Sequence, residues 1–154
     1  MTRWVLATLW CRVSSVECRV LRTASNVSAA SGMDQFAEEM KERTMQFAVR
    51  VARFCRTLPE TWEGRHVADQ LFRCCTGQAS NFSASCRGRT RREFAAKLGT
   101  VVEESDETVF WLTFINRAGI SNCEELKNLM KEGRELLAIF AASAKTARTD
   151  PGLR

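Results

Sequence analysis

Proline, histidine and glycine are scarce in this sequence of 154 residues, and long apolar runs are absent. Only two prolines occur, Pro59 and Pro151, so the chain between them can form long uninterrupted helices. No stretch of 18 apolar residues exists, which predicts no transmembrane helix and no membrane partner. Hydrophobic residues make up 45% of the chain and charged residues 27%, a balance that favours one globular domain with its own core.

The sequence also lacks the residue patterns of enzymes and metalloproteins. It contains no glycine-rich phosphate loop and no nucleophile motif. Its one histidine, His66, stands near an expected helix start, where we expect an exposed side chain rather than a catalytic one. The acidic group at residues 103–107 has no Glu-x-x-His partner of the kind that di-metal helical bundles use. We therefore expect no catalytic residue, no metal ligand, no cofactor and no small-molecule substrate.

Seven cysteines are present, an odd number, and none of them forms a C-x-x-C pair. With a single histidine, the chain offers few ligands for a tetrahedral zinc ion. Free cysteine packs well as a small apolar residue, so this spacing favours reduced thiols in a cytoplasmic protein. The seven are Cys11, Cys18, Cys55, Cys74, Cys75, Cys86 and Cys123.

Residues 1–32 differ from the rest of the chain. They are rich in serine, valine and arginine and show no helical stripe, whereas an amphipathic pattern begins at Met33. A short apolar segment at 4–11 is similar to a signal-peptide core, but the charges that follow it, such as Arg12 and Glu17, argue against one. We expect a disordered or mis-assigned extension over 1–32, a helical bundle over 33–148 and a tail over 149–154. The extension carries four arginines and one glutamate, which leaves only +2 of the net charge of +5 for the rest.

Apolar residues recur at helical spacing in four segments, and no strand pattern competes. The expected helices run over 34–56, 65–86, 91–118 and 122–147. Pro59 ends the first helix and Gly119 the third, while capping boxes at Thr90–Glu93 and Ser121–Glu124 begin the third and the fourth. Four long helices with short joints predict an all-α, antiparallel up-down-up-down four-helix bundle. The fourth helix is expected to turn these residues inward: Leu126, Met130, Gly133, Leu137, Phe140 and Ala144.

Two polar residues fall among the inward positions of the second helix. Gln78 lies near the centre of its apolar stripe and Asn81 on the flank of that stripe. Buried polar groups need hydrogen-bond partners or they destabilise the fold. We expect both side chains to be buried and to serve helix register or partner choice, as polar residues do at coiled-coil seams.

A cluster of basic residues occupies the joint between the second and third helices. Arginine side chains and the backbone N–H groups of a helix start both favour anions, so the cluster is the best candidate for binding nucleic acid. The alternative is a solvated basic loop that pairs with acids of other helices. Arg43, Arg50 and Arg53 on the first helix are expected to extend the same surface. The cluster consists of Arg87, Arg89, Arg91, Arg92 and Lys97.

The third helix carries a second apolar patch, which indicates a subunit interface. Phe110 and Phe114 lie nearly opposite the inner stripe with Trp111 beside them, so an isolated bundle would expose the rings. Glu103 and Glu107 repel each other at i,i+4 spacing, and arginines of a neighbouring subunit would neutralise them. The alternative is that the N-terminal extension or a loop covers the patch.

The order of several short motifs resembles one bacterial family, the four-helix-bundle proteins encoded in 23S ribosomal RNA intervening sequences. The accessory protein of diversity-generating retroelements is a related branch. The resemblance covers residues 33–148 and depends on motif order and spacing, because each motif alone is weak. The motifs include Glu42-Arg43-Thr44, Leu58-Pro59, Gln70-Leu71, Asn81-Phe82, Val102-Glu103-Glu104 and Trp111-Leu112.

The resemblance implies an antiparallel four-helix bundle that assembles as a homopentamer, with no established enzymatic activity. The retroelement branch binds nucleic acid and a reverse transcriptase through a strongly basic surface. This chain departs from that branch because its bundle carries a net charge of only about +2. It departs from the family again at Ser85-Cys86, where an acidic residue and alanine are frequent.

These observations predict a non-enzymatic, oligomeric helical bundle in the cytoplasm that binds RNA or DNA through the basic cluster. The alternative is a protein-interaction scaffold without a nucleic-acid role, in which the arginines contact Glu103 and Glu107 of a neighbouring subunit.

Overall fold

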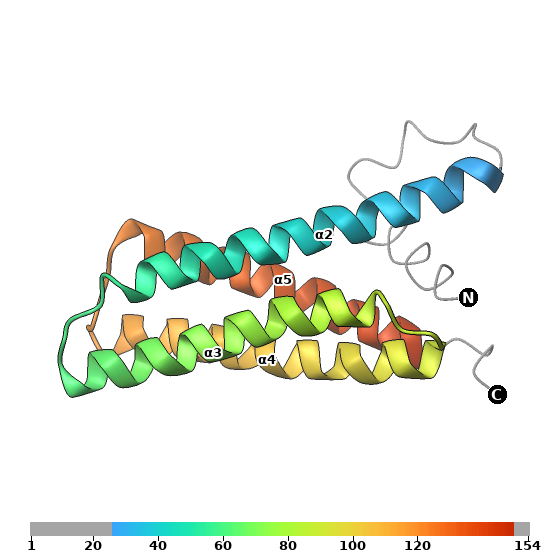
Figure 1. Cartoon of the computed structure of the whole chain (residues 1–154). Helices are drawn as coiled ribbons and strands as arrows, with labels where there is room; N and C mark the ends of the chain where they lie inside the picture. The colour runs from blue at the N-terminus through green and yellow to red at the C-terminus, as the bar shows by residue number, and fades with distance from the viewer. Residues whose placement is uncertain (1–25, 150–154) are drawn as a thin grey trace.

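The computed structural model describes residues 26–149, which form four α-helices labelled as in Figure 1. They are α2 (Asn26–Cys55), α3 (Trp62–Ser85), α4 (Arg91–Arg117) and α5 (Glu124–Thr149). Successive helices run antiparallel, and residues 26–149 contain no strand. The predicted all-α four-helix bundle is confirmed.

Threonine side chains begin two of the helices. Thr61 accepts a hydrogen bond from the Gly64 N–H at 3.1 Å, so α3 starts three residues before the predicted Arg65. Thr90 accepts from the Glu93 N–H at 3.1 Å and begins α4 as predicted. Gly119 adopts a left-handed φ of 69° just after α4, which confirms its role as the C-terminal cap.

The starts of α2 and α5 also differ from the prediction. The α2 helix begins at Asn26, eight residues before Asp34, because no proline interrupts the segment that precedes Met33 and two alanines in it favour a helix. The rest of the predicted extension, residues 1–25, lies outside the described residues. The α5 helix begins at Glu124, two residues after the predicted start, and the Ser121 hydroxyl donates to the Cys123 sulfur at 3.6 Å.

Cys123 is therefore the residue that precedes the first helical position, and its carbonyl accepts from the Lys127 N–H at 3.4 Å. Hydrogen bonds to the thiolate from Ser121 and from the backbone N–H groups of Leu126 and Glu125 lower the pKa of Cys123.

The core lies between the inward faces of all four helices. Phe82 of α3 packs against Phe140 of α5 with ring centroids 5.1 Å apart, and the α3–α4 and α4–α5 contacts are the most extensive. Gly133 of α5 faces this core, and an added Cβ there would lie 3.5 Å from Phe47 and from Val109, an ordinary van der Waals contact.

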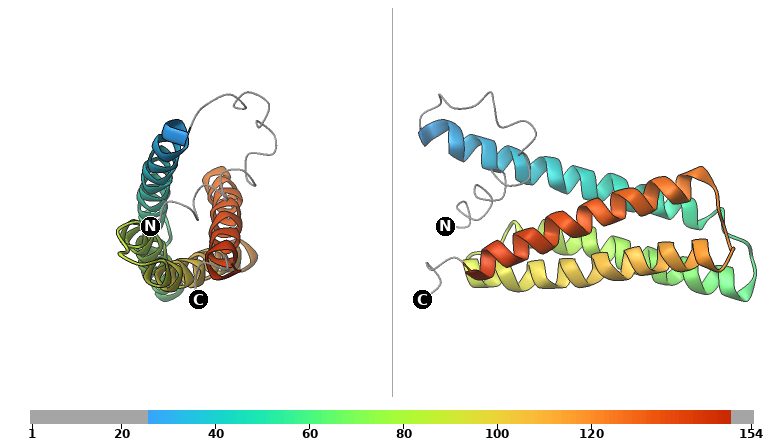
Figure 2. Two further views of the ribbon diagram at one scale, coloured as in Figure 1. Left: turned by 90° about the vertical axis from the view of Figure 1, so that its right-hand side faces the viewer. Right: turned by 180° about the vertical axis from the view of Figure 1, so that it is seen from behind.

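The predicted inward stripe of α5 is rotated slightly from the observed one. Leu129 and Leu136 are fully buried, whereas the predicted Met130 and Leu137 are half-buried. The reason is that α5 packs mainly against α4 and makes few contacts with α2. The two views of Figure 2 show α2 and α5 diverging toward the N-terminal end of α2.

Candidate nucleic-acid interface

The predicted basic cluster lies at one end of the bundle, in the joint between α3 and α4. The end of α5 lies at the same end of the molecule (Figure 1). Successive hydrogen bonds close the joint tightly: Arg87 N–H to the Ala84 carbonyl at 3.1 Å and Gly88 N–H to the Ser85 carbonyl at 3.0 Å. Gly88 is buried there, and the joint leaves the side chains of Arg87 and Arg89 exposed.

Four cations of this cluster have no acidic partner among the described residues. Arg87 donates to the neutral Ser83 hydroxyl at 2.9 Å. Within residues 35–148, no ion pair involves Arg87, Arg89, Arg92 or Lys97. The backbone of Arg91 opens α4, and its side chain is outside the description. We call these five residues, Arg87, Arg89, Arg91, Arg92 and Lys97, the basic joint.

The start of α4 contributes less to anion binding than the sequence predicts. The capping box uses two of the backbone N–H groups that an anion would need. Thr90 accepts from Glu93, and the Glu93 carboxylate accepts from the Arg89 N–H at 3.1 Å. The attraction for anions at this end therefore comes mainly from side chains.

Arg43 and Arg50 do not extend the basic joint, so that prediction is wrong. Both reach across from α2 to α5, where Glu132 accepts from Arg43 at 3.2 Å and from Arg50 at 2.6 Å. These arginines form ion pairs with acids that lie 75 or more positions away in the sequence. Local sequence patterns do not predict such pairs. We call the group the ion-pair seam; it consists of Arg43, Arg50, Glu125, Glu132 and Glu135. The bond to Glu125 is the main reason that the pKa of Arg50 is raised.

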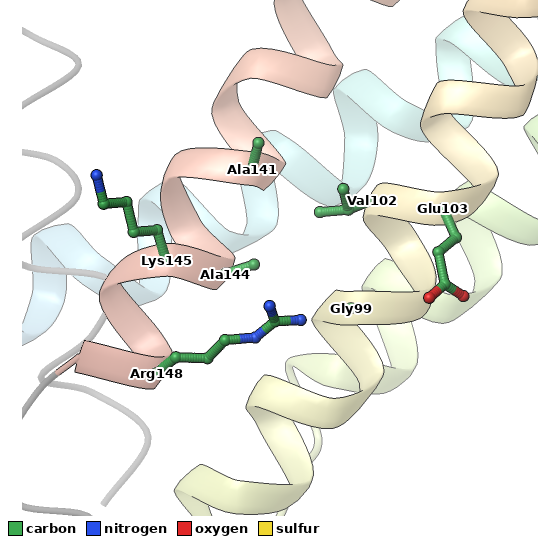
Figure 3. Close-up of a pocket in the computed structure, with 7 residues that line it drawn as sticks. All are labelled: Gly99, Val102, Glu103, Ala141, Ala144, Lys145 and Arg148. Carbon is green, nitrogen blue, oxygen red and sulfur yellow. The ribbon is translucent and has the colours of Figure 1, made fainter.

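Sequence reasoning missed two cations at the basic end. Lys145 and Arg148 lie in the last turns of α5, where basic residues commonly offset the helix dipole. That placement was the only signal available in the sequence. The Arg148 guanidinium crosses to α4 and lies 3.4 Å from the position of a Cβ on Gly99, as Figure 3 shows. A cavity of about 370 Å³ lies between α4 and α5 at this point.

The predicted aromatic patch faces outward. Phe110 and Phe114 are 57% and 42% exposed, and no described loop or helix covers them. Trp111 is half-buried between them, with ring centroids 5.1 Å from Phe110 and 5.9 Å from Phe114. His66 of α3 packs edge-on against Trp111 at 5.8 Å and so has a structural contact, which sequence reasoning did not anticipate. We call Phe110, Trp111 and Phe114 the aromatic patch.

The acids near this patch have separate environments. Glu107 pairs with Arg73 of α3 at 3.3 Å, so its neutralisation needs no second subunit. Glu104 lies against Gly77, where an added Cβ would be 2.9 Å from the carboxyl carbon. Desolvation, and then the charge of Glu107, raises the pKa of Glu104. Glu103 is exposed and lines the α4–α5 cavity.

Polar burial matches the prediction at one of two positions. Gln78 is only 1% exposed, and neither its amide nitrogen nor its amide oxygen has a hydrogen-bond partner. Asn81 is only half-buried, because it lies on the flank of α3 rather than on the inward face. Gln78 is therefore the one predicted buried polar residue that the structure confirms.

The thiols and acids of the described residues offer no metal site. No group of three or more His, Cys, Asp or Glu side chains between residues 35 and 148 could hold a metal ion. The five cysteines in this range are free thiols, and burial raises the pKa of Cys55 to about 11. No helix in the described part is long and apolar enough to cross a bilayer.

Comparisons with known proteins bear on the bundle as a whole. A family model described as "23S rRNA-intervening sequence protein" matches residues 38–142. Among solved structures, the chain is similar to a protein of unknown function from the S23 ribosomal protein family of Bacteroides thetaiotaomicron. The two share 22% identity with a TM-score of 0.63, and the match covers 68% of this chain and 97% of that one. None of the curated proteins compared with the chain matches it.

Proposed function

The chain belongs to the 23S rRNA-intervening sequence protein family, and from this premise we propose that it is a non-enzymatic bundle that binds nucleic acid through the basic joint. The ligand is the sugar–phosphate backbone of RNA or DNA. Because phosphate contacts carry no sequence information directly, binding is largely independent of sequence and strongly dependent on salt.

One observation carries the proposal: among the described residues, four cations of the basic joint lack acidic partners, whereas Arg43 and Arg50 are paired within the bundle. An exposed cation without a partner attracts phosphate without first breaking an ion pair. Two such side chains, Arg89 and Arg92, and the half-buried Lys97 lie within nine positions of one another at one end of the bundle. Clustering of this kind is the electrostatic footprint of a nucleic-acid contact, even where the net charge of the domain is small.

The test measures the affinity of the full chain for a labelled RNA hairpin and for a DNA duplex of matching sequence by fluorescence anisotropy at several salt concentrations. The variant replaces Arg89, Arg92 and Lys97 with glutamine. A matched control replaces Arg53, Arg117 and Lys131 with glutamine, which removes the same charge near the end of α2, the end of α4 and the start of α5, at the opposite end of the bundle. We expect weakened binding and a shallower salt dependence only in the joint variant. If both variants lost the same affinity for nucleic acid, the loss would be explained by net charge alone, which would contradict a binding site at the joint.

A second candidate function, self-association, is favoured by the aromatic patch. Two exposed phenylalanines stacked on the same helix, with centroids 6.4 Å apart, form the kind of apolar surface that subunit interfaces bury. We propose a homo-oligomer, a pentamer by family resemblance, that repeats the basic joint around a ring and so multiplies weak phosphate contacts. Light scattering on the Phe110→Ser, Phe114→Ser variant tests this: a mass equal to that of the wild type would reject the patch as the interface.

A further inference from the structure

The cavity between α4 and α5 has an unusual combination of walls. Its floor is made of small or apolar groups, Gly99, Val102, Ala141 and Ala144. Arg148 reaches across one end of the floor and lies against the backbone of Gly99 (Figure 3), while Lys145 points away from it. The cavity is open to solvent on one side, and its volume of about 370 Å³ lies within the range of small-molecule sites.

The polar groups at the rim are chemically opposite. Arg148 is a donor only, has no ion pair or hydrogen bond to another residue between 35 and 148, and suits a phosphate group. Glu103 is an acceptor only. It follows Gly99 by one helical turn on α4, which separates the two residues by about 6 Å along the helix axis. A ligand that fills this cavity has an anion at one end, N–H donors at the other and a compact apolar body between them.

We propose that the α4–α5 cavity binds one unpaired guanine nucleotide of the RNA that contacts the basic joint. Arg148 donates to its phosphate, the base lies on the alanine and glycine floor, and the Glu103 carboxylate accepts from adjacent N–H groups of guanine. Guanine fits best because its base edge offers two neighbouring N–H donors to the two carboxylate oxygens. Single-stranded nucleotides are also the positions at which proteins usually read RNA bases. The inference rests on the proposed function, since the RNA arrives through the joint.

The geometry of α4 connects the cavity to the joint. Arg92 precedes Gly99 by seven residues, which is two helical turns, so both residues share one face of α4 about 10 Å apart. Arg92 is exposed and without an ion pair in the described part of the chain. A strand whose phosphate contacts Arg92 therefore leads along the same face toward Gly99 and Glu103.

The first arm of the test titrates the full chain with guanosine, adenosine, cytidine and uridine monophosphates, and with inorganic phosphate, by calorimetry. Ala141→Leu fills the cavity from an exposed helix position, and Arg148→Gln removes the guanidinium. Arg134→Gln is the matched control on the outer side of the same helix. Circular dichroism melts check that each variant folds. We expect guanosine monophosphate to bind best and both cavity variants to weaken it by at least about tenfold.

The second arm compares a blunt RNA duplex with the same duplex carrying one unpaired guanosine. We expect the overhang to strengthen binding to the wild type and to the Arg134→Gln control, but not to Ala141→Leu. Absence of guanosine monophosphate binding, equal binding of inorganic phosphate, or an overhang effect that survives in Ala141→Leu would each overturn the cavity site. Failure of the proposed function can be distinguished from failure of the cavity site, because in that case neither RNA binds to the wild type at low salt.

Discussion

Arginines at the basic joint and arginines in the ion-pair seam carry the same charge in two different surroundings. At the joint, Arg89 and Arg92 are exposed and have no acidic partner among the described residues. In the seam, Arg43 and Arg50 are half-buried and share Glu132. The comparison teaches that the number of arginines does not locate a phosphate-binding surface, because acids on a neighbouring helix decide which of them remain available.

The two regions also differ in what they do for the fold. Few side chains pack between α2 and α5, so the seam holds together two helices that otherwise make limited contact. Ion pairs between partly buried groups stabilise modestly, and losing one partner leaves the other charge uncompensated. An unpaired charge in water costs little, so the joint keeps its cations without loss of stability.

The largest expected effect separates the two regions by function. Replacing Arg89, Arg92 and Lys97 with glutamine should weaken binding to an RNA hairpin at low salt by roughly a hundredfold. Replacing Arg43 and Arg50 should change that affinity far less, because these side chains are already bound to acids. Anisotropy titrations of both variants check the difference. If the seam variant lost as much affinity as the joint variant, the distinction between paired and available arginines would be wrong.

A second prediction extends the comparison to an unpaired polar group in the core. Unlike an exposed cation, the buried amide of Gln78 loses its water without gaining a hydrogen bond. Gln78→Leu keeps a similar volume and should raise the free energy of unfolding by about 1–3 kcal/mol. Urea denaturation measures the change, with Gln46→Leu on the exposed face of α2 as the control. A loss of stability in Gln78→Leu would show that the amide is satisfied in solution.

The third prediction breaks the ion-pair seam at its shared acid. Glu132 accepts from both Arg43 and Arg50, so Glu132→Gln removes two ion pairs at once. Because all three side chains remain partly exposed, the expected loss of stability is about 1 kcal/mol. RNA affinity should stay nearly unchanged, because Arg43 still pairs with Glu135 and Arg50 with Glu125. Denaturation curves and anisotropy on the same preparation check both effects; Glu124→Gln, whose carboxylate pairs only with Lys127, serves as the control.

The smallest expected effect concerns pH and Glu104. Its pKa is raised in the folded protein, so between pH 4.5 and that raised value the folded state binds more protons than the unfolded state. Stability therefore falls as pH rises through this window. Glu104→Gln should be more stable than the wild type at pH 7, and the difference should shrink toward pH 4. Urea denaturation midpoints of both proteins at pH 7 and pH 4 test this prediction. If Glu104→Gln were more stable than the wild type by the same amount at both pH values, ionisation of Glu104 would not be the cause.

Local patterns predicted most of the architecture. The stripe of α3, the capping box at Thr90 and the cap at Gly119 depend on residues within a few positions of one another, so their spacing in the sequence is enough to recognise them. The outward position of Phe110 and Phe114 follows from the same periodicity. The capping box at Ser121 was wrong because a neighbouring cysteine took the capping position, a choice between two adjacent residues that spacing alone does not resolve.

The sequence by itself determined four helices, their joints, the basic joint and the outward aromatic patch, because each depends on helical periodicity and short-range capping. Tertiary structure alone decided the rotation of α5, the pairing of Arg43 and Arg50, and the placement of Arg148 over Gly99 beside a cavity. These features depend on how helices distant in sequence are rotated and spaced against each other. The arrangement of the helices minimises the free energy of the whole core, so it cannot be predicted from the sequence of any single segment.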